Sequence, residues 1–206
     1  MIIKVCGMRD PENIRQLTAL DINWIGFIFY DKSPRFFGIK NKTKPDEIPK
    51  TKIGVFVNAS IEDITEISSK YRLNYIQLHG NESPDLCYTL HKQGYKLIKA
   101  FPVSTIDDLG RTTDYEGCVD YFLFDTKCDT YGGSGKHFDW SLLSAYHGKT
   151  PFILSGGIQA ENIDAIRQVC HSQFAGIDLN SGFEMKPGIK DINKLSEFIK
   201  KVKTIK

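Results

Sequence analysis

The chain alternates eight times between a short apolar segment and a helix-like segment, and this alternation restricts its fold more than any other feature. The predicted strands cover residues 2–6, 24–29, 53–57, 75–78, 96–101, 121–125, 152–154 and 174–179. Such alternation implies parallel strands joined by right-handed crossovers. Eight units favour a closed α/β barrel, the (β/α)8 TIM barrel, over an open sheet. The sequence therefore predicts a single barrel domain over residues 1–206.

Helix start signals support this alternation. Asp10 followed by Pro11 is typical of a helix N-terminus, and Ser60 precedes an apolar pattern with helical spacing. Pro45 and Pro49 leave room for only a short or broken helix between the second and third strands. Further helical segments are predicted over residues 83–93, 104–114, 159–170 and 189–205, with another starting at residues 139–140. No GxGxxG motif follows the first strand, which argues against a dinucleotide-binding fold.

Composition excludes several classes of partner. A net charge of +2 indicates no nucleic-acid partner, and the lysines near the end alternate with apolar residues as on an amphipathic helix. The five cysteines are scattered without CxxC spacing, and the histidines lack metal-ligand spacing, so neither a metal nor a cofactor is expected. No apolar run approaches the length of a signal peptide or a membrane span. We expect a cytoplasmic protein with no membrane partner.

Polar residues lie near the carboxyl ends of several predicted strands, on one face only. They are Lys4, Cys6, Gln77, His79, Asp125, Asp178 and Asn180. By alternation, the apolar residues Ile3, Val5, Ile76, Leu78, Phe124 and Ile177 take the opposite face and pack against the helices. The polar set would then converge in the mouth of the barrel, where TIM barrels carry their active sites. For Lys4 and Asp178 a buried ion pair is favoured over direct catalysis, and His79 is expected to be hydrogen-bonded.

Cys6 and Asp125 differ from the rest of this polar set, because each ends a separate strand with a group that can exchange a proton. A thiol with a pKa near 8.5 is a few per cent thiolate at neutral pH, and more beside a cation, so Cys6 could act as a base. Core packing is the alternative role for Cys6. Asp125 would have to carry a proton to act as an acid. A base and an acid on opposite sides of a ligand form the arrangement that an isomerase needs.

Glycine-bearing loops follow the last three predicted strands. They contain Gly133 within a GGSG sequence, the Gly156–Gly157 pair, and Ser181 with Gly182. Glycines let backbone N–H groups approach an anion closely, and TIM barrels commonly bind phosphate after strands seven and eight. A GGSG sequence alone also fits a surface turn. Together the three loops predict a phosphorylated small-molecule ligand.

Several motifs, in order along nearly the whole chain, resemble the phosphoribosylanthranilate isomerase family. They are KVCGM (4–8), GFIFYDKSPRF (26–36), GVFVN (54–58), QLHGNE (77–82), FDTKCDTYGGSGKHFDW (124–140), LSGGI (154–158), DLNSGFE (178–184) and PGIKD (187–191). The resemblance implies an enzyme of tryptophan biosynthesis. Its reaction would be an Amadori rearrangement of N-(5-phosphoribosyl)anthranilate to 1-(2-carboxyphenylamino)-1-deoxyribulose 5-phosphate.

The resemblance also implies roles for individual residues. Asp125 would be the general acid that opens the furanose ring, and Cys6 the general base that removes a proton from the second sugar carbon. Arg35 would bind the anthranilate carboxylate, a geometry that suits a guanidinium. The remaining substrate-binding residues would be Gly133, Gly156, Gly157, Asp178, Ser181 and Gly182. Whether the enzyme is a monomer or a homodimer is left open.

Three departures from the family pattern concern the mouth. Asn180 and Phe183 stand where serine and valine are usual, which could alter the phosphate loop, and Phe36-Phe37 replaces Tyr-Val after Arg35. The segment after Arg35 is also shorter and more polar than usual. Two alternative functions compete with the family assignment. The histidine-pathway phosphoribosyl isomerase shares the fold and rearrangement but would carry aspartate at position 6 and a repeated half-barrel. A non-catalytic phospho-ligand-binding domain would keep the glycine loops without an opposed base and acid.

Overall fold

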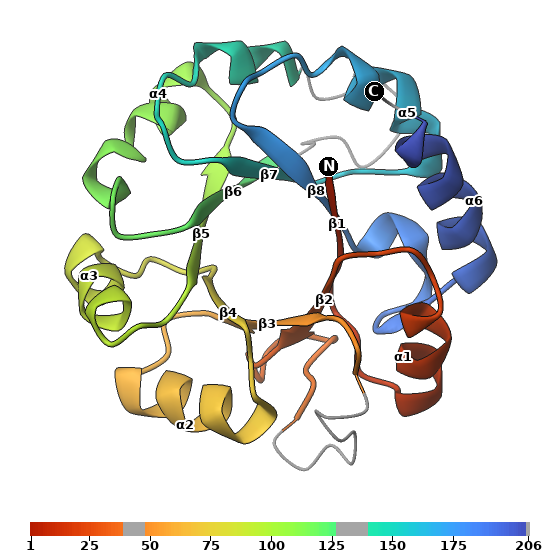
Figure 1. Ribbon diagram of the computed structural model, residues 1–206, viewed down its shortest axis with the longest axis horizontal. Helices are drawn as coiled ribbons and strands as arrows, with labels where there is room; N and C mark the ends of the chain where they lie inside the picture. Colours follow the sequence, from red (N-terminus) through yellow and green to blue (C-terminus); the bar gives the residue numbers. More distant parts are fainter. Residues whose placement is uncertain (39–47, 127–139, 205–206) are drawn as a thin grey trace.

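Eight parallel strands form a closed barrel in the computed structural model, which describes residues 1–38, 48–126 and 140–204 (Figure 1). The strands pair in sequence order, and the last pairs with the first. They are β1 (Ile2–Val5), β2 (Trp24–Ile28), β3 (Thr51–Phe56), β4 (Tyr75–Leu78), β5 (Leu97–Val103), β6 (Tyr121–Thr126), β7 (Phe152–Ser155) and β8 (Phe174–Leu179). The predicted (β/α)8 TIM barrel is confirmed.

Helices surround the barrel in the described part of the chain (Figure 1). The α-helices are α1 (Pro11–Thr18), α2 (Ile61–Tyr71), α3 (Pro84–Lys92), α4 (Ile106–Gly110), α5 (Ile163–Gln168) and α6 (Ile192–Lys203). The predicted N-caps are confirmed, because the side chains of Asp10 and Ser60 accept hydrogen bonds from the backbone N–H groups of Asn13 and Asp63. These caps satisfy donors that the first helical turn leaves unpaired.

Several predicted helices are shorter than expected or are 3-10 helices. The segments predicted over 104–114 and 159–170 each split into a short α-helix and a 3-10 turn, η2 (Thr113–Tyr115) and η4 (Ala160–Asn162). The helix expected from residues 139–140 is the 3-10 helix η3 (Trp140–Ala145). Most of the segment with Pro45 lies outside the described residues.

The start of the terminal helix was predicted three residues too early. Ile189–Lys190 form a strand, β10, that pairs antiparallel with β9 (Glu184–Lys186), and α6 begins only at Ile192 with Asp191 as its N-cap. Gly188 has a φ of 83°, a left-handed conformation that glycine adopts readily and that suits the turn between these strands. The sequence prediction missed this hairpin because Ile189 also fits the apolar spacing of the helix that follows.

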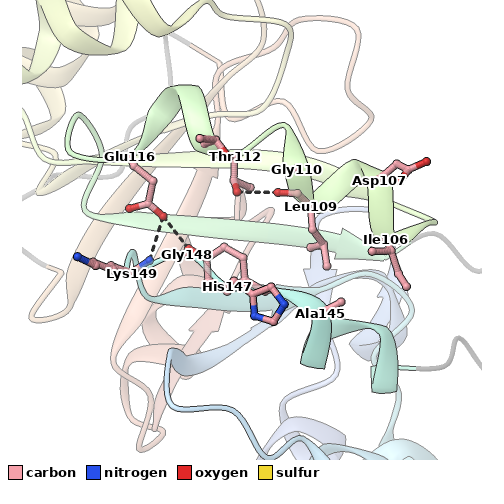
Figure 2. A pocket seen from close by; sticks show the side chains of 12 residues that line it. Ile106, Asp107, Leu109, Gly110, Thr112, Glu116, Ala145, His147, Gly148 and Lys149 are labelled. Atoms are coloured by element: carbon pink, nitrogen blue, oxygen red, sulfur yellow. Dashed lines mark hydrogen bonds between the residues drawn. The ribbon is translucent and has the colours of Figure 1, made fainter.

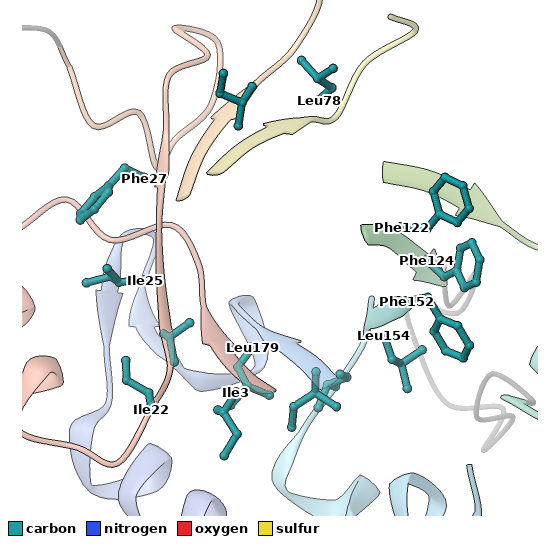
Figure 3. Packing of buried hydrophobic residues seen from close by; sticks show 14 of the residues in the cluster. Ile3, Ile22, Ile25, Phe27, Leu78, Phe122, Phe124, Phe152, Leu154 and Leu179 are labelled. Carbon is teal, nitrogen blue, oxygen red and sulfur yellow. The ribbon is translucent and has the colours of Figure 1, made fainter. Parts of the chain in front are cut away.

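The barrel wall separates two hydrophobic clusters. The outer cluster contains all six residues predicted to face the helices, among them Ile3, Leu78 and Phe124 (Figure 3). The inner cluster is centred on Trp24, which stacks on Tyr75 at 5.0 Å and meets Tyr121 edge-on at 5.2 Å between ring centroids. These three aromatic residues begin their strands, so they fill the amino end of the barrel. The carboxyl end is left to the polar residues.

Candidate active site

A buried lysine is the centre of the polar set inside the barrel. Lys4 is fully buried, and its Nζ donates hydrogen bonds to Asp178 Oδ2 and Gln77 Oε1, both at 2.7 Å. Burial acts to lower the pKa of Lys4, but the charges of Asp178 and Cys6 outweigh it and raise that pKa. The ammonium is therefore held in its charged form, and the predicted ion pair with Asp178 is confirmed.

Gln77 extends these contacts from Lys4 towards Asp125. Its Nε2 lies 2.8 Å from Nδ1 of His79, which confirms the expected hydrogen bond of that histidine. The other ring nitrogen of His79, Nε2, lies 3.5 Å from Asp125 Oδ2. The Asp125 side chain is 31% exposed, so a ligand in the mouth can reach it.

Cys6 follows β1 directly and is almost completely buried. Its thiol occupies the space left by Gly26, where an added Cβ would lie only 2.7 Å from Sγ. Burial raises the pKa of the Cys6 thiol, an effect that exceeds the lowering by Lys4 and Lys190. The cations expected beside the thiol are present, but the raised pKa works against the prediction of a partly ionised thiol at neutral pH.

Arg35 is held at the mouth by an ion-pair network that sequence analysis missed. Its Nε and Nη2 donate to the Glu184 carboxylate at distances from 2.6 to 3.1 Å. Glu184 also accepts from the buried Lys190 Nζ at 2.7 Å, and this ammonium donates to Asn180 Oδ1 at 2.7 Å. Burial acts to raise the pKa of Glu184, but Arg35 and Lys190 outweigh it and lower that pKa. Both Glu184 and Lys190 lie in motifs already noted in the sequence, yet only the β9–β10 hairpin brings them to Arg35.

The glycine loops after β7 and β8 lie in direct contact. An added Cβ on Gly182 would lie 2.3 Å from the carbonyl oxygen of Ile158, so only glycine fits this approach. Gly156 and Gly157 have φ angles of 89° and 63°. Ser181 is exposed beside them. Gly133 and the rest of the GGSG sequence, the third predicted loop, lie outside the described residues.

The departures at Asn180 and Phe183 have different structural consequences. The Phe183 side chain is fully buried and packs against Phe198 at 4.8 Å between ring centroids, in the helical layer under α6. Its bulk is therefore directed into the core. The Asn180 amide is held by Lys190, and an added Cβ on Gly7 would lie 2.9 Å from its Oδ1. Asn180 thus belongs to the network around Arg35.

The other cysteines have distinct environments. Cys87 and Cys118 are buried, and burial raises the pKa of Cys87 to about 12. Cys170 is exposed and lies outside α5, so the prediction of a helix over residues 159–170 is wrong at this residue. The physical reason is that α5 ends at Gln168, two residues earlier. Cys128 lies outside the described residues.

A second buried lysine fixes the loop after β4. Lys99 Nζ donates to Glu82 Oε2 at 3.1 Å and to the carbonyl oxygens of Leu78 and Gly80 at 3.3 and 2.8 Å. Glu82 in turn accepts from the N–H of Gly80. Leu78 and Gly80 are the residues immediately before and after His79, so these contacts hold the backbone on both sides of the histidine. Lys99 carries no role in the sequence prediction.

A cavity of about 730 Å³ lies on the outside of the barrel, between α4 and the segment that leads into β7 (Figure 2). None of its lining residues belongs to the predicted site. One of its two acidic lining residues, Glu116, accepts hydrogen bonds from Thr150 Oγ1 at 2.6 Å and Tyr146 Oη at 3.1 Å. Glu116 therefore has a structural role in joining these segments.

Within residues 1–38, 48–126 and 140–204, no helix has the length and apolar character needed to cross a membrane. The same residues contain no group of three or more histidine, cysteine, aspartate or glutamate side chains placed to hold a metal ion.

Sequence similarity relates the whole chain to known proteins. A sequence profile described as N-(5'-phosphoribosyl)anthranilate (PRA) isomerase matches residues 3–201. The chain is 60% identical to an N-(5'-phosphoribosyl)anthranilate isomerase of Parabacteroides distasonis, over 98% of this chain and 93% of that protein. The chain belongs to the N-(5'-phosphoribosyl)anthranilate isomerase family. It is thus an enzyme, an isomerase of tryptophan biosynthesis.

Solved phosphoribosylanthranilate isomerase structures have the same fold. The crystal structure from Thermotoga maritima superimposes with a TM-score of 0.83 at 33% identity, covering 99% of this chain and all of that one. Another structure is a complex with reduced 1-(o-carboxyphenylamino)-1-deoxyribulose 5-phosphate. It has a TM-score of 0.80 at 30% identity and covers 99% of this chain and 100% of its own. That isomerase therefore binds a phosphorylated small molecule.

Proposed function

We propose that the mouth of this barrel carries out the Amadori rearrangement of N-(5-phosphoribosyl)anthranilate, with Asp125 as general acid and Cys6 as general base. One observation carries the proposal. Cys6 directly follows β1 and Asp125 lies at the carboxyl end of β6, and contacts through Lys4, Gln77 and His79 connect the two residues across the barrel. A ligand that fills the mouth would lie between a proton donor and a proton acceptor.

In the first step Asp125 donates a proton to the furanose oxygen. The bond between that oxygen and the first sugar carbon breaks, which gives an open-chain Schiff base. Cys6 then takes a proton from the second carbon, and the resulting enolamine tautomerises to the ketone 1-(2-carboxyphenylamino)-1-deoxyribulose 5-phosphate. Asp125 has lost one proton and Cys6 has gained one, so the next cycle begins when this proton returns to Asp125. The Lys4 and Lys190 ammonium groups favour the thiolate that the second step requires.

Substrate binding is assigned to three groups. Arg35 would bind the anthranilate carboxylate through guanidinium donors other than those given to Glu184. The backbone of Gly133, Gly156, Gly157 and Gly182, with Ser181, would bind the phosphate. Asp178 would accept from a sugar hydroxyl, because its buried Oδ1 has no hydrogen-bond partner among the described residues. The substrate is the expected small-molecule partner, and no cofactor, nucleic acid or membrane takes part in this scheme.

The deciding experiment is a turnover assay with N-(5-phosphoribosyl)anthranilate that follows the loss of its fluorescence. Turnover on this substrate supports the proposal. Turnover only on the histidine-pathway substrate would favour that related isomerase. Binding without turnover of either would favour a phospho-ligand-binding domain. We further propose that residues 1–206 work as one barrel domain in the cytoplasm, either as a monomer or as a homodimer.

Inorganic phosphate should compete with substrate for the loops after β7 and β8. Replacing the exposed Ser181 with tryptophan should weaken this inhibition, because the indole would cover the backbone donors of Gly182. Inhibition constants from steady-state kinetics, with circular dichroism as a folding check, measure the effect. Ser172→Trp changes another exposed serine outside the glycine loops and should leave inhibition as it was. Equal inhibition of both variants would place the anion elsewhere.

Replacing Glu184 with glutamine should raise KM about tenfold with a smaller change in kcat. The neutral amide no longer anchors Arg35 with a charge-assisted pair, so the guanidinium loses the orientation in which it meets a carboxylate. The variant should also unfold at a lower temperature, because Lys190 stays buried with a weaker partner. Glu197→Gln, an exposed change on α6, is the matched control. An unchanged KM would remove the Glu184–Arg35 pair from substrate binding.

A further inference from the structure

We propose that Gln77 is a positioning residue that fixes the tautomer of His79 and so keeps a neutral imidazole beside Asp125. The inference rests on the proposed role of Asp125 as general acid. It assigns a task to a strand residue that contacts neither reacting proton.

The contact with Lys4 fixes the orientation of the Gln77 amide. An ammonium has only donors, and Lys4 Nζ lies 2.7 Å from Gln77 Oε1. Turning the amide over would direct its NH₂ group at this buried cation. Lys4 also donates to Asp178 Oδ2 at 2.7 Å on the neighbouring strand β8. The amide oxygen therefore faces Lys4, and the amide nitrogen faces His79.

The amide nitrogen of Gln77 then fixes the tautomer of the His79 ring. Gln77 Nε2 can only donate, so His79 Nδ1 at 2.8 Å must be the acceptor and carries no hydrogen. The neutral ring then has its hydrogen on Nε2, the atom that lies 3.5 Å from Asp125 Oδ2. A protonated His79 ring would also carry a hydrogen on Nδ1, and two donors, this N–H and the NH₂ group of Gln77, would then face each other. The backbone on both sides of His79 is also held, because Lys99 Nζ donates to the carbonyl oxygens of Leu78 and Gly80.

The protonation state of the His79 ring affects Asp125, the proposed general acid. The charged groups near His79 include Asp125 on β6, Asp178 on β8 and Lys4 on β1, together with the Lys99–Glu82 pair that contacts the residues flanking it. The two carboxylates favour a protonated ring, and an imidazolium beside Asp125 would hold that carboxylate ionised. An ionised Asp125 has no proton to give. A neutral His79 ring does not hold Asp125 in its ionised form. Its Nε2–H can still donate to the Asp125 carboxylate after Asp125 has given its proton to the substrate.

The test converts Gln77 to glutamate, whose carboxylate accepts from both Lys4 and a protonated His79. We expect kcat at neutral pH to fall about tenfold and one limb of the pH–kcat profile to move to lower pH by about one unit, as a tenfold stronger acid requires. In ¹⁵N NMR spectra, the His79 ring should change from one protonated nitrogen to two. Gln93→Glu adds the same charge at an exposed position and should change none of these results. An unchanged profile with a neutral ring would overturn the proposal.

The wild-type enzyme provides a second test that does not depend on whether Gln77→Glu folds. Its ¹⁵N spectrum should show His79 with Nε2 protonated and Nδ1 bare throughout the pH range of activity. An Nδ1–H tautomer or an imidazolium in that range would overturn the assignment. Failure of the proposed function can be distinguished from failure of the Gln77 assignment. If only the proposed function is wrong, the Asp125→Asn variant stays active while the His79 spectrum is as expected.

Discussion

Replacing Asp125 with asparagine should lower kcat on the order of 10²–10⁴-fold, the usual contribution of a general acid. The amide has nearly the shape of the carboxylate but cannot deliver the proton that opens the furanose ring. The barrel should stay folded, because the Asp125 side chain is 31% exposed and lies 3.5 Å from His79 Nε2, where the oxygen of an asparagine could also accept a hydrogen bond. Steady-state kinetics and circular dichroism together measure the two parts of this result.

Asp114→Asn is the matched control, since it makes the same change at an exposed position on η2 and should keep full activity. A folded Asp125→Asn enzyme with near-native kcat would remove this carboxylate from the mechanism. Ring opening would then need another donor in the mouth.

Replacing Cys6 with serine should cause a loss of similar size, on the order of 10²–10⁴-fold in kcat, because a hydroxyl is far too weak a base. Serine is smaller than cysteine and fits the space beside Gly26, so the change should leave the fold intact. Cys170→Ser and Cys128→Ser should both keep activity. If Cys6→Ser turns over normally, its thiol serves only in packing, and the base must be sought among Asp178 and His79.

Alkylation gives an independent measure of Cys6. Among the cysteines in the described residues, the exposed Cys170 would react first, so the experiment belongs in a background that carries both Cys170→Ser and Cys128→Ser. Burial raises the pKa of Cys6, and only the thiolate reacts, so inactivation should be slow at neutral pH and quicken as the pH rises towards that pKa. Bound product should protect the thiol. Inactivation at a rate independent of pH would show that another residue had been modified.

The strands and the polar mouth could be predicted because both depend on local patterns. Alternation along β1 and β8 sets Lys4 and Asp178 on the same face, and a buried charge needs a partner. The role of Lys190 could not be predicted in this way. It follows from the antiparallel pairing of β9 and β10, whereas the local spacing favours an earlier start of α6.

The burial of Cys6 was also out of reach of sequence reasoning. The position of a thiol at a strand end predicts access from the mouth. Its actual exposure depends on Gly26 on the neighbouring strand, which admits the sulfur atom into the wall. Such a contact is set by the register of β1 against β2 and has no local sequence signal.

The pairing of β1 with β8 has a consequence for the synthesis of the chain. Lys4 is among the first residues made, and its partner Asp178 is made 174 residues later. Until β8 is available, a compact intermediate that buried Lys4 would hold an unpaired charge, which is strongly unfavourable. Amino-terminal fragments should therefore leave the barrel open and β1 exposed to solvent or to chaperones. Closing the barrel and completing the mouth become one late event, so a nascent chain gains its chemistry only when nearly all of it has been made.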